Sequence, residues 1–293
     1  MSHCDAAILP DRGAVRIGGA DARKFLQGLI TSDMEKARDG AAIHAGLLSP
    51  QGKILFDFFV VPAGDSFFLE GPRRLAGDLS KRLGFYKLRA AVTVTEEPAI
   101  QVAAIWGDDT IAEVQGAIVY PDPRVSELGY RALVPERIGL GAALGCTETS
   151  AEAYHALRIG LGVPEGGRDF AYGDAFPHEA LFDQLNGVDF AKGCYVGQEV
   201  VSRMEHRGTA RKRIVPVSGD EPLPATGAEI MAGGVPIGTL GSVNGKDGLA
   251  LLRLDRAGEA LAAGKPLTAG GVPIRLRRPA FARFDMPVEA AAS

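Results

Sequence analysis

The pattern of apolar and polar positions predicts a helix followed by hairpins in the first third of the chain. Segment 21–30 repeats its apolar residues with the 3.6-residue period of an amphipathic helix. The residues on this stripe are Phe25, Leu26, Leu29 and Ile30. Short apolar runs bounded by turn residues predict strands at 14–17, 41–49, 54–61 and 66–71. Gly-containing turns at 50–53 and 62–65 join the last three strands into a meander.

Helices and strands alternate through the middle of the chain. We expect helices at 71–84, 108–115 and 150–162, and strands at 90–95 and 101–107. Gly84 is expected to end the first of these helices. The stretch 163–179 has three Gly and two Pro and is expected to be a long ordered loop, a kind of segment that often carries function.

From Arg213 onward the pattern changes to short apolar runs separated by Gly, Pro and Asp. Turn signals at this spacing predict a small β-barrel or sandwich. We place the domain boundary near 208–212 and expect the tail 286–293 to be loose.

Composition narrows the protein class. The chain has 293 residues, enough for about two domains, and a formal net charge of −4, so no overall basic field indicates nucleic-acid binding. No apolar run approaches the roughly 18 residues of a membrane span, and the N-terminus lacks a signal-peptide pattern. The three cysteines, Cys4, Cys146 and Cys194, are far apart and odd in number. We therefore expect no disulfide framework and a reducing, cytoplasmic location.

The segment 190–199, FAKGCYVGQE, is the most unusual in the chain and runs into a predicted helix. Glu199 lies in the first turn of that helix, where a carboxylate complements the dipole, and Gly208 lies at the C-cap. Cys194 precedes the helix and follows Lys192, and both features favour a thiolate. From these residues alone, Cys194 is either a reactive thiol or a buried structural cysteine.

The whole string KGCYVGQE, residues 192–199, resembles the signature of the YgfZ family within the glycine-cleavage T-protein superfamily. The approach to it, AFPHEALFDQLNGVDF, and the continuation SRMEHRGTARKR also resemble that family. The N-terminal VRIGGADARKFLQGLITSDM resembles the opening of the superfamily.

The resemblance implies an α+β multidomain fold. Its parts would be a discontinuous folate-binding domain (1–48 with 141–208), a ferredoxin-like domain (49–140) and a C-terminal β-barrel (209–285). It also implies a factor that binds tetrahydrofolate or a one-carbon derivative and supports iron–sulfur proteins, including tRNA-modifying enzymes. Cys194 would be its central residue.

The chain departs from the catalytic T-proteins. Where those enzymes have Gly-Gly-Ile-x-Asp-Asp, it reads GKILFD at 52–57, so Phe56 replaces one Asp and Asp57 remains. T-proteins also have an acidic residue and Phe where this chain has Cys194 and Tyr195. These differences argue against ordinary glycine-cleavage aminomethyl transfer. Asp57 keeps a folate-dependent transferase as the alternative, although it could simply lie on the wet face of a strand.

Other candidate residues would hold the folate. Glu179 could pair with the donor edge of a pterin, or simply start a helix, and Tyr195 and Phe176 could stack on the ring or pack in the core. The resemblance adds Lys192, Gln198, Glu199, Arg203 and Arg207 to the binding set. Arg203 and Arg207 belong to a basic run that could equally be a solvated helix end.

No His or Cys spacing indicates a resident metal or cluster site.

The residues and the resemblance leave three hypotheses for the function: a folate-dependent factor for iron–sulfur proteins, a tetrahydrofolate-dependent aminomethyl or methyl transferase, and an interaction protein with a degenerate pocket. The expected partners are iron–sulfur enzymes or assembly factors, without a membrane or direct nucleic-acid contact.

Overall fold

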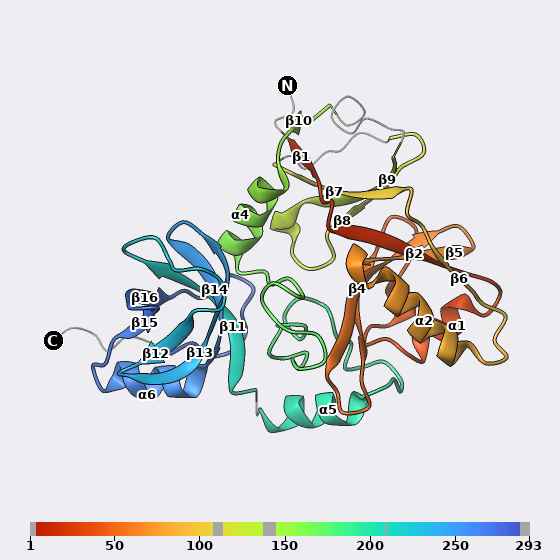
Figure 1. Ribbon diagram of the computed structural model, residues 1–293. Helices are drawn as coiled ribbons and strands as arrows, with labels where there is room; N and C mark the ends of the chain where they lie inside the picture. The colour runs from red at the N-terminus through yellow and green to blue at the C-terminus, as the bar shows by residue number, and fades with distance from the viewer. Residues whose placement is uncertain (1–3, 108–113, 137–144, 209, 288–293) are drawn as a thin grey trace. The chain divides into compact units, whose positions relative to one another are not determined.

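The computed structural model describes residues 4–107, 114–136, 145–208 and 210–287 (Figure 1). The chain divides into two compact units, Met1–His155 with Leu185–Gln198, and Ala156–Gln184 with Glu199–Ser293. Most of the helix predicted at 108–115 and the end of the predicted tail lie outside the described residues. The domain boundaries predicted from the sequence stay predictions.

The predicted hairpins form an antiparallel sheet in the first unit. Its strand order is β3 (Ile43–Leu48), β4 (Ile54–Ala63), β5 (Ser66–Pro72), β2 (Arg12–Gly18) and β6 (Thr93–Glu96). Gly52 and Gly64 have positive φ in the two turns, which explains why the turns need glycine. The meander predicted from the sequence is confirmed.

One face of this sheet carries the apolar core of the unit. Helices α1 (Ala22–Gln27) and α2 (Ala76–Lys87) cover it, with short 3₁₀ turns η1 (Met34–Lys36) and η2 (Arg73–Leu75) beside them. Leu26 of α1 and Leu83 of α2 are fully buried against Phe58 of β4. The prediction that Gly84 ends the second helix is wrong, because α2 continues for three more residues to Lys87.

A second sheet of the first unit runs in the order β10 (Thr147–Glu148), β1 (Asp5–Ile8), β7 (Ile100–Trp106), β9 (Tyr130–Pro135) and β8 (Ile118–Pro121). A 3₁₀ turn, η3 (Ser126–Leu128), precedes β9.

This sheet corrects the cysteine prediction, because Cys4 and Cys146 form a disulfide. Strand β1 pairs in parallel with β10, with Asp5 opposite Thr147. Each cysteine directly precedes its paired strand, so the pairing brings together two thiols that are 142 residues apart.

The second unit contains the predicted C-terminal barrel, which is confirmed as a closed six-stranded one. Its order is β11 (Lys212–Gly219), β14 (Asp247–Arg253), β13 (Val235–Asn244), β12 (Glu229–Ala232), β15 (Leu267–Ala269) and β16 (Val272–Leu276). Directly after β14 the chain forms a helix, α6 (Leu254–Ala262), which packs Ala257 and Ala260 into the barrel core.

A buried ion pair connects the predicted loop after 162 to the barrel within the second unit. Helix α4 (Ala151–Leu161) ends in this unit, and Arg158 Nη1 donates to Asp169 Oδ2 at 2.7 Å. Arg158 also donates to Ser242 Oγ at 2.7 Å, and the Ser242 amide donates to Asp169 Oδ1 at 2.7 Å. Gly241 leaves room for this carboxylate, because a Cβ there would lie 2.5 Å from Asp169 Oδ1. None of the described helices is long and apolar enough to cross a membrane.

Candidate functional site

The face of the β3–β4–β5 sheet opposite the apolar core carries polar side chains. His44 pairs with Phe59, and Phe59 with Glu70, so these residues share one face by strand alternation. Asp57, two residues before Phe59, lies on the same face and is 9% exposed. This face is buried, so the alternative that Asp57 lies on a solvent-exposed face of its strand is wrong.

Three arginines surround the ring of Phe59. The guanidinium carbons of Arg12, Arg124 and Arg131 lie 5.7, 5.0 and 5.4 Å from the ring centroid, and all three side chains are buried. Arg12 pairs with Glu70, which also accepts a hydrogen bond from the Tyr120 hydroxyl at 3.0 Å. Burial and the Glu70 carboxylate raise the pKa of Tyr120, so its hydroxyl keeps the proton it donates.

Asp122 balances the other two arginines. It accepts from Arg124 at 2.7 and 2.9 Å and from Arg131 at 3.2 Å, while both arginines also donate to the Tyr154 hydroxyl. Burial alone would raise the pKa of Asp122, but the Arg124 guanidinium outweighs it and holds that pKa well below its usual range. Asp122, Arg124 and Arg131 are therefore charged at neutral pH.

His44 is the neutral member of this polar face. Its Nδ1 lies 2.9 Å from the Leu185 carbonyl oxygen, which can only accept, so Nδ1 carries the hydrogen. Burial lowers the pKa of His44 to about 4, against the smaller opposing effects of that hydrogen bond and of Asp57. The imidazole is thus uncharged at neutral pH.

A cavity of about 210 Å³ opens beside His44. Its lining mixes polar and apolar side chains: Ser32, Lys36, Ala42, Ile43, His44, Pro123, Asn186, Val188 and Asp189. Lys36 Nζ lies 2.6 Å from Asp189 Oδ2, so an ammonium and a carboxylate stand together at this cavity. Asn186 has a positive φ of 58° and donates to the Pro123 carbonyl at 2.9 Å, which fixes the chain where it lines the cavity.

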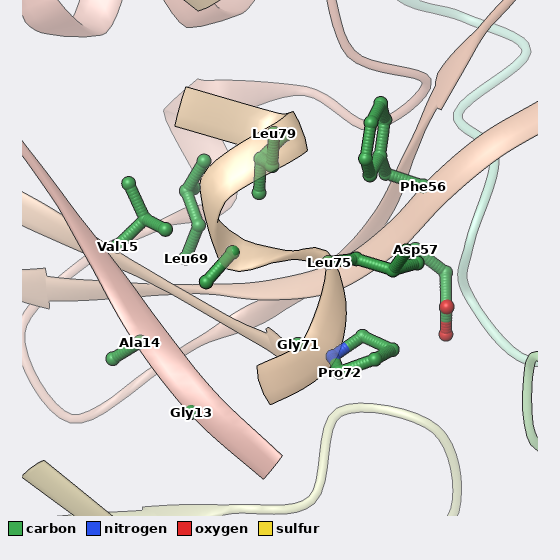
Figure 2. A pocket seen from close by; sticks show the side chains of 11 residues that line it. Gly13, Ala14, Val15, Phe56, Asp57, Leu69, Gly71, Pro72, Leu75 and Leu79 are labelled. Carbon is green, nitrogen blue, oxygen red and sulfur yellow. The ribbon is translucent and has the colours of Figure 1, made fainter. Parts of the chain in front are cut away.

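A second hollow, between α2 and the sheet, is an apolar packing gap (Figure 2). Its volume is about 10 Å³, which is about the limit for one water. Phe56, Leu69 and Leu79 line it, while the Asp57 carboxylate points away from them in Figure 2. Phe56, which stands where T-proteins have an Asp, is therefore a core residue.

Lys192 of the signature is anchored inside the first unit. Its Nζ donates to the carbonyls of Gln27 at 2.8 Å, Ile30 at 2.6 Å and Ser32 at 3.1 Å. An ammonium has three N–H groups, so each of them donates to one backbone carbonyl at or just beyond the end of α1. Burial lowers the pKa of Lys192 to about 8, and the side chain remains a cation at neutral pH.

The rest of the signature loop is held by Tyr195 and Gly197. Tyr195 is buried, its ring centroid lies 5.2 Å from Lys192 Nζ, and burial raises its pKa to about 12. Gly197 has a φ of 81°, and a Cβ there would lie 2.5 Å from the Ser49 carbonyl oxygen in the β3–β4 turn. Between these anchors, Cys194 is an exposed free thiol.

The boundary between the two units falls inside the signature, between Gln198 and Glu199. Helix α5 (Gln198–Arg207) begins here as predicted, and the exposed Glu199 and Arg203 form an i, i+4 ion pair of 2.7 Å. Gln198 is half-buried and Arg207 is exposed. Glu179, in the second unit, accepts a hydrogen bond from the Phe176 amide at 2.9 Å, a local turn contact. The predicted binding roles of these residues stay predictions.

Two groups of metal-ligating residue types occur in the described residues. In the second unit, His178, Asp183 and Glu205 offer ligand atoms within 4.8 Å of one another. Both Asp183 oxygens accept from Arg213 at 2.9 Å, and His178 Nε2 lies 2.9 Å from Glu205 Oε2. The guanidinium would repel a cation, so we assign no metal to this group.

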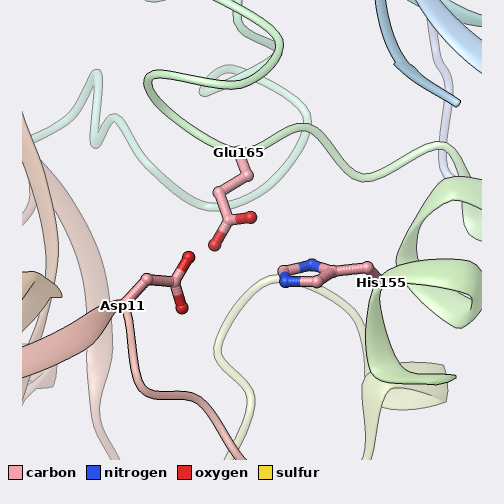
Figure 3. Close-up of side chains that lie close together, drawn as sticks. All are labelled: Asp11, His155 and Glu165. Carbon is pink, nitrogen blue, oxygen red and sulfur yellow. The ribbon is translucent and has the colours of Figure 1, made fainter. Parts of the chain in front are cut away.

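Asp11 and His155 offer ligand atoms within 4.8 Å of each other in the first unit (Figure 3). Glu165, the third side chain drawn there, belongs to the second unit, where it lies 3.0 Å from Arg168 Nε. Two residues are too few to define a metal site, and none is assigned.

Sequence reasoning missed His44, Asn186 and Asp189. A histidine inside the apolar run 41–49 and the Asn186-Gly187 turn were the available signals. Neither signal is specific, because the cavity depends on segments more than 140 positions apart that only the fold brings together.

Residues 211–284 match the family described as "CAF17, C-terminal beta-barrel domain". The human mitochondrial iron–sulfur cluster assembly factor IBA57 is 35% identical over 271 residues, which cover 83% of this chain and 76% of the human protein. The IBA57 homologue of Neurospora crassa is 34% identical over 230 residues, covering 71% of this chain. The matched part is about half (52%) of that fungal relative.

The crystal structure of glycine cleavage system aminomethyltransferase T from Bartonella henselae has a similar fold. The TM-score is 0.74 at 16% identity, and the match covers 98% of this chain and 88% of that one. At this identity the likeness establishes the α+β fold alone.

Proposed function

Because the chain belongs to the IBA57 family of iron–sulfur cluster assembly factors, we propose that it binds tetrahydrofolate, or a one-carbon derivative, and supports assembly or repair of iron–sulfur proteins. Its proposed partners are iron–sulfur enzymes, including ones that modify tRNA, and other assembly factors. The proposed location is the cytoplasm, although the Cys4–Cys146 disulfide removes the cysteine argument for a reducing compartment. The human and Neurospora relatives carry "mitochondrial" in their names.

The cavity beside His44 supports the folate part of the proposal. Its volume of about 210 Å³ is below the range of roughly 300–1,000 Å³ typical of pockets for whole drug-sized ligands. Such a cavity suits one bicyclic ring and leaves a longer tail outside. The pterin ring of tetrahydrofolate has that shape.

The polar groups of the cavity also suit a pterin. The ring edge presents N–H donors beside a carbonyl acceptor, and Asp189 with Lys36 offers a carboxylate beside an ammonium. The neutral imidazole of His44 adds a polar wall without a net charge. Asp189 is thus our main candidate for the pterin-binding carboxylate, in addition to the Glu179 predicted from the sequence.

The exposed thiol of Cys194 supports the cluster part. Thiolates are the usual ligands of iron–sulfur clusters, and a loop anchored by Lys192 and Gly197 would present the sulfur at a fixed position. The cluster is cargo in this proposal, and Cys194 is the residue that would contact it.

Calorimetric titration with tetrahydrofolate tests the cavity. We expect saturable binding to the native protein and at least tenfold weaker binding to Asp189→Asn. The matched control is Asp220→Asn, which removes an exposed carboxylate paired with Arg275 on the barrel and should bind like the native protein. No binding to the native protein, or equal binding by both variants, would overturn the folate assignment.

A second experiment tests Cys194 separately. Purified apo [4Fe–4S] enzyme is reconstituted with iron and sulfide, with native protein or Cys194→Ser. We expect native protein to raise the yield of active enzyme and the variant to lose this effect, with an unchanged melting temperature. Equal support by both proteins would remove Cys194 from the mechanism, whatever the folate result.

A tetrahydrofolate-dependent aminomethyl or methyl transferase is the second candidate. Asp57 favours it, because this buried carboxylate shares a sheet face with His44 and acts electrostatically on it. A carboxylate could orient or protonate a folate nitrogen during one-carbon transfer. Turnover of a methylated amine with tetrahydrofolate that disappears in Asp57→Asn would establish this activity, and its absence in the native protein would exclude it.

A further inference from the structure

Helix α2 has an exposed side whose composition is unusual for a solvated helix. Leu79 and Leu83 point into the core, whereas Phe85 is 67% exposed and Leu88, directly after the helix, is 88% exposed. Single exposed apolar residues are common, but here two large ones lie one turn apart. The isolated unit gains nothing from exposing them.

The backbone at Leu88 is also unusual. Its φ of 45° and ψ of −107° belong to a region that glycine adopts easily and that a branched side chain avoids. Such conformations persist where the surrounding structure imposes them, and they gather at functional positions. The chain thus holds an apolar side chain in water on a strained backbone.

Gly84 is a third unusual residue of this helix. It lies inside α2, where glycine disfavours the helix relative to alanine, and no atom lies within 4 Å of a Cβ built on it. Nothing within the described residues therefore requires a glycine here. A missing side chain does leave room for another backbone to approach the helix.

The charges around Phe85 and Leu88 are mostly positive in a chain of net charge −4. Lys81, Arg82 and Arg89 are exposed, and none of the three forms an ion pair in the part of the chain that the structure describes. Two exposed acids, Asp78 on α2 and Glu96 on the neighbouring β6, lie toward the start of the helix. At its end, the half-buried Asp21 accepts a hydrogen bond from the Ala91 amide at 2.7 Å, so one carboxylate lies close to the three cations. The end of α2 is therefore an apolar and cationic patch.

We propose that this patch, formed by Lys81, Arg82, Gly84, Phe85, Leu88 and Arg89, docks an acidic amphipathic helix of a partner protein. Acidic side chains of the partner would pair with the three cations, and its apolar stripe would cover Phe85 and Leu88. Gly84 would let the two helices approach closely. The proposal does not depend on folate binding or on Cys194.

A protein helix fits this patch better than a lipid surface or a nucleic acid. Interfacial helices bury a whole apolar face in lipid, but the apolar face of α2 is already in the core and only two side chains remain. Nucleic acid would use the cations but not Leu88, which offers no stacking surface. An acidic helix uses the charges and both apolar groups.

The probe is a labelled synthetic helical peptide with leucines on one face and glutamates on the other. Its twin carries lysine in place of every glutamate. Fluorescence anisotropy measures binding of each peptide to the full chain. We expect the acidic peptide to bind at least tenfold more tightly than the lysine twin, with affinity falling as salt is raised.

Four variants locate the binding. Phe85→Ser and Leu88→Gly should each weaken the acidic peptide at least tenfold, and Lys81→Glu with Arg82→Glu should reverse the preference between the twins. Leu88→Gly relieves the strained backbone, so its melting temperature should not fall. Val235→Ser, at a 59% exposed valine in the β12–β13 hairpin, is the matched control and should bind normally.

Gly84→Ala separates docking from folding. Alanine should raise the melting temperature of the first unit and weaken the peptide, because a methyl group then stands in the contact. Equal binding of the twins, unchanged binding by the Phe85 and Leu88 variants, or no binding at all would overturn the proposal. The proposal would also be overturned if the protein bound anionic phosphatidylglycerol vesicles through the same residues and did not bind the peptide.

Discussion

Acidification should destabilise the first unit through His44. The pKa of this imidazole falls from its ordinary 6.5 to about 4 because burial disfavours the cation. Above pH 6.5 the group is neutral in the folded and the unfolded chain. Between pH 6.5 and about 4 only the unfolded chain binds the proton, so the free energy of unfolding falls as the pH falls.

The size of the effect follows from the two pKa values. Each pKa unit corresponds to about 1.4 kcal/mol, so a gap between 6.5 and about 4 gives a loss of about 3 kcal/mol across this window. Asp122 stays ionised throughout, because Arg124 holds its pKa well below this range. Its unfolded form takes up a proton only near the acid end of the window, and this contribution is common to the native protein and the variants compared below.

The assay is urea unfolding followed by Trp106 fluorescence. Trp106 is the single tryptophan and lies on β7 in the same unit as His44. The comparison variant is His44→Asn, whose side-chain amide can still donate to the Leu185 carbonyl but does not titrate. His206→Asn, at an exposed histidine of α5, controls for histidine replacement in general.

We expect the native protein to lose about 3 kcal/mol more than His44→Asn between about pH 7 and about pH 4. The His206 variant should follow the native curve. A difference below about 1 kcal/mol would refute the reasoning, because it would mean that the imidazole is hydrated or charged in the folded state.

Three further perturbations test other contacts. Lys192→Met removes the ammonium donor from three carbonyls, two of them buried, and should lower the free energy of unfolding by about 3 kcal/mol in urea titrations; a loss below about 1 kcal/mol would contradict the anchoring role. Gly241→Ala places a methyl group 2.5 Å from a carboxylate oxygen of the buried ion pair and should lower the melting temperature of the barrel, whereas Gly160→Ala, with open space around it, should not. Reducing the Cys4–Cys146 disulfide should lower stability by about 2–4 kcal/mol, and Cys4→Ser with Cys146→Ser should remove the response to dithiothreitol.

Local signals in the sequence predict much of the fold. The hairpins from 41 to 72 follow from apolar runs interrupted by Gly52 and Gly64, and both glycines have positive φ in the structure. The helix that begins at Gln198 and the barrel after Arg213 follow from equally local patterns. In each case the residues that determine the element are neighbours in the chain.

What the sequence could not predict depends on distant pairing. The disulfide requires β1 to pair in parallel with β10, and no local pattern encodes a partner 142 residues away. Asp57 and His44 show the same limit, because they share a face only through the register of β3 with β4, and no local pattern indicates that arginines and tyrosines bury that face. The cavity beside His44 was missed for this reason.

The signature divides into residues that hold a loop and a residue that the loop presents. All three N–H groups of the Lys192 ammonium donate to backbone carbonyls, and the close approach of the Ser49 carbonyl requires a glycine at position 197. Substitutions at these two positions should therefore act through folding, and their effect on function would follow from a displaced loop. Cys194 is exposed and makes no such contact among the described residues, so its replacement should leave stability unchanged. Lys192 and Gly197 thus hold the loop on which Cys194 is exposed.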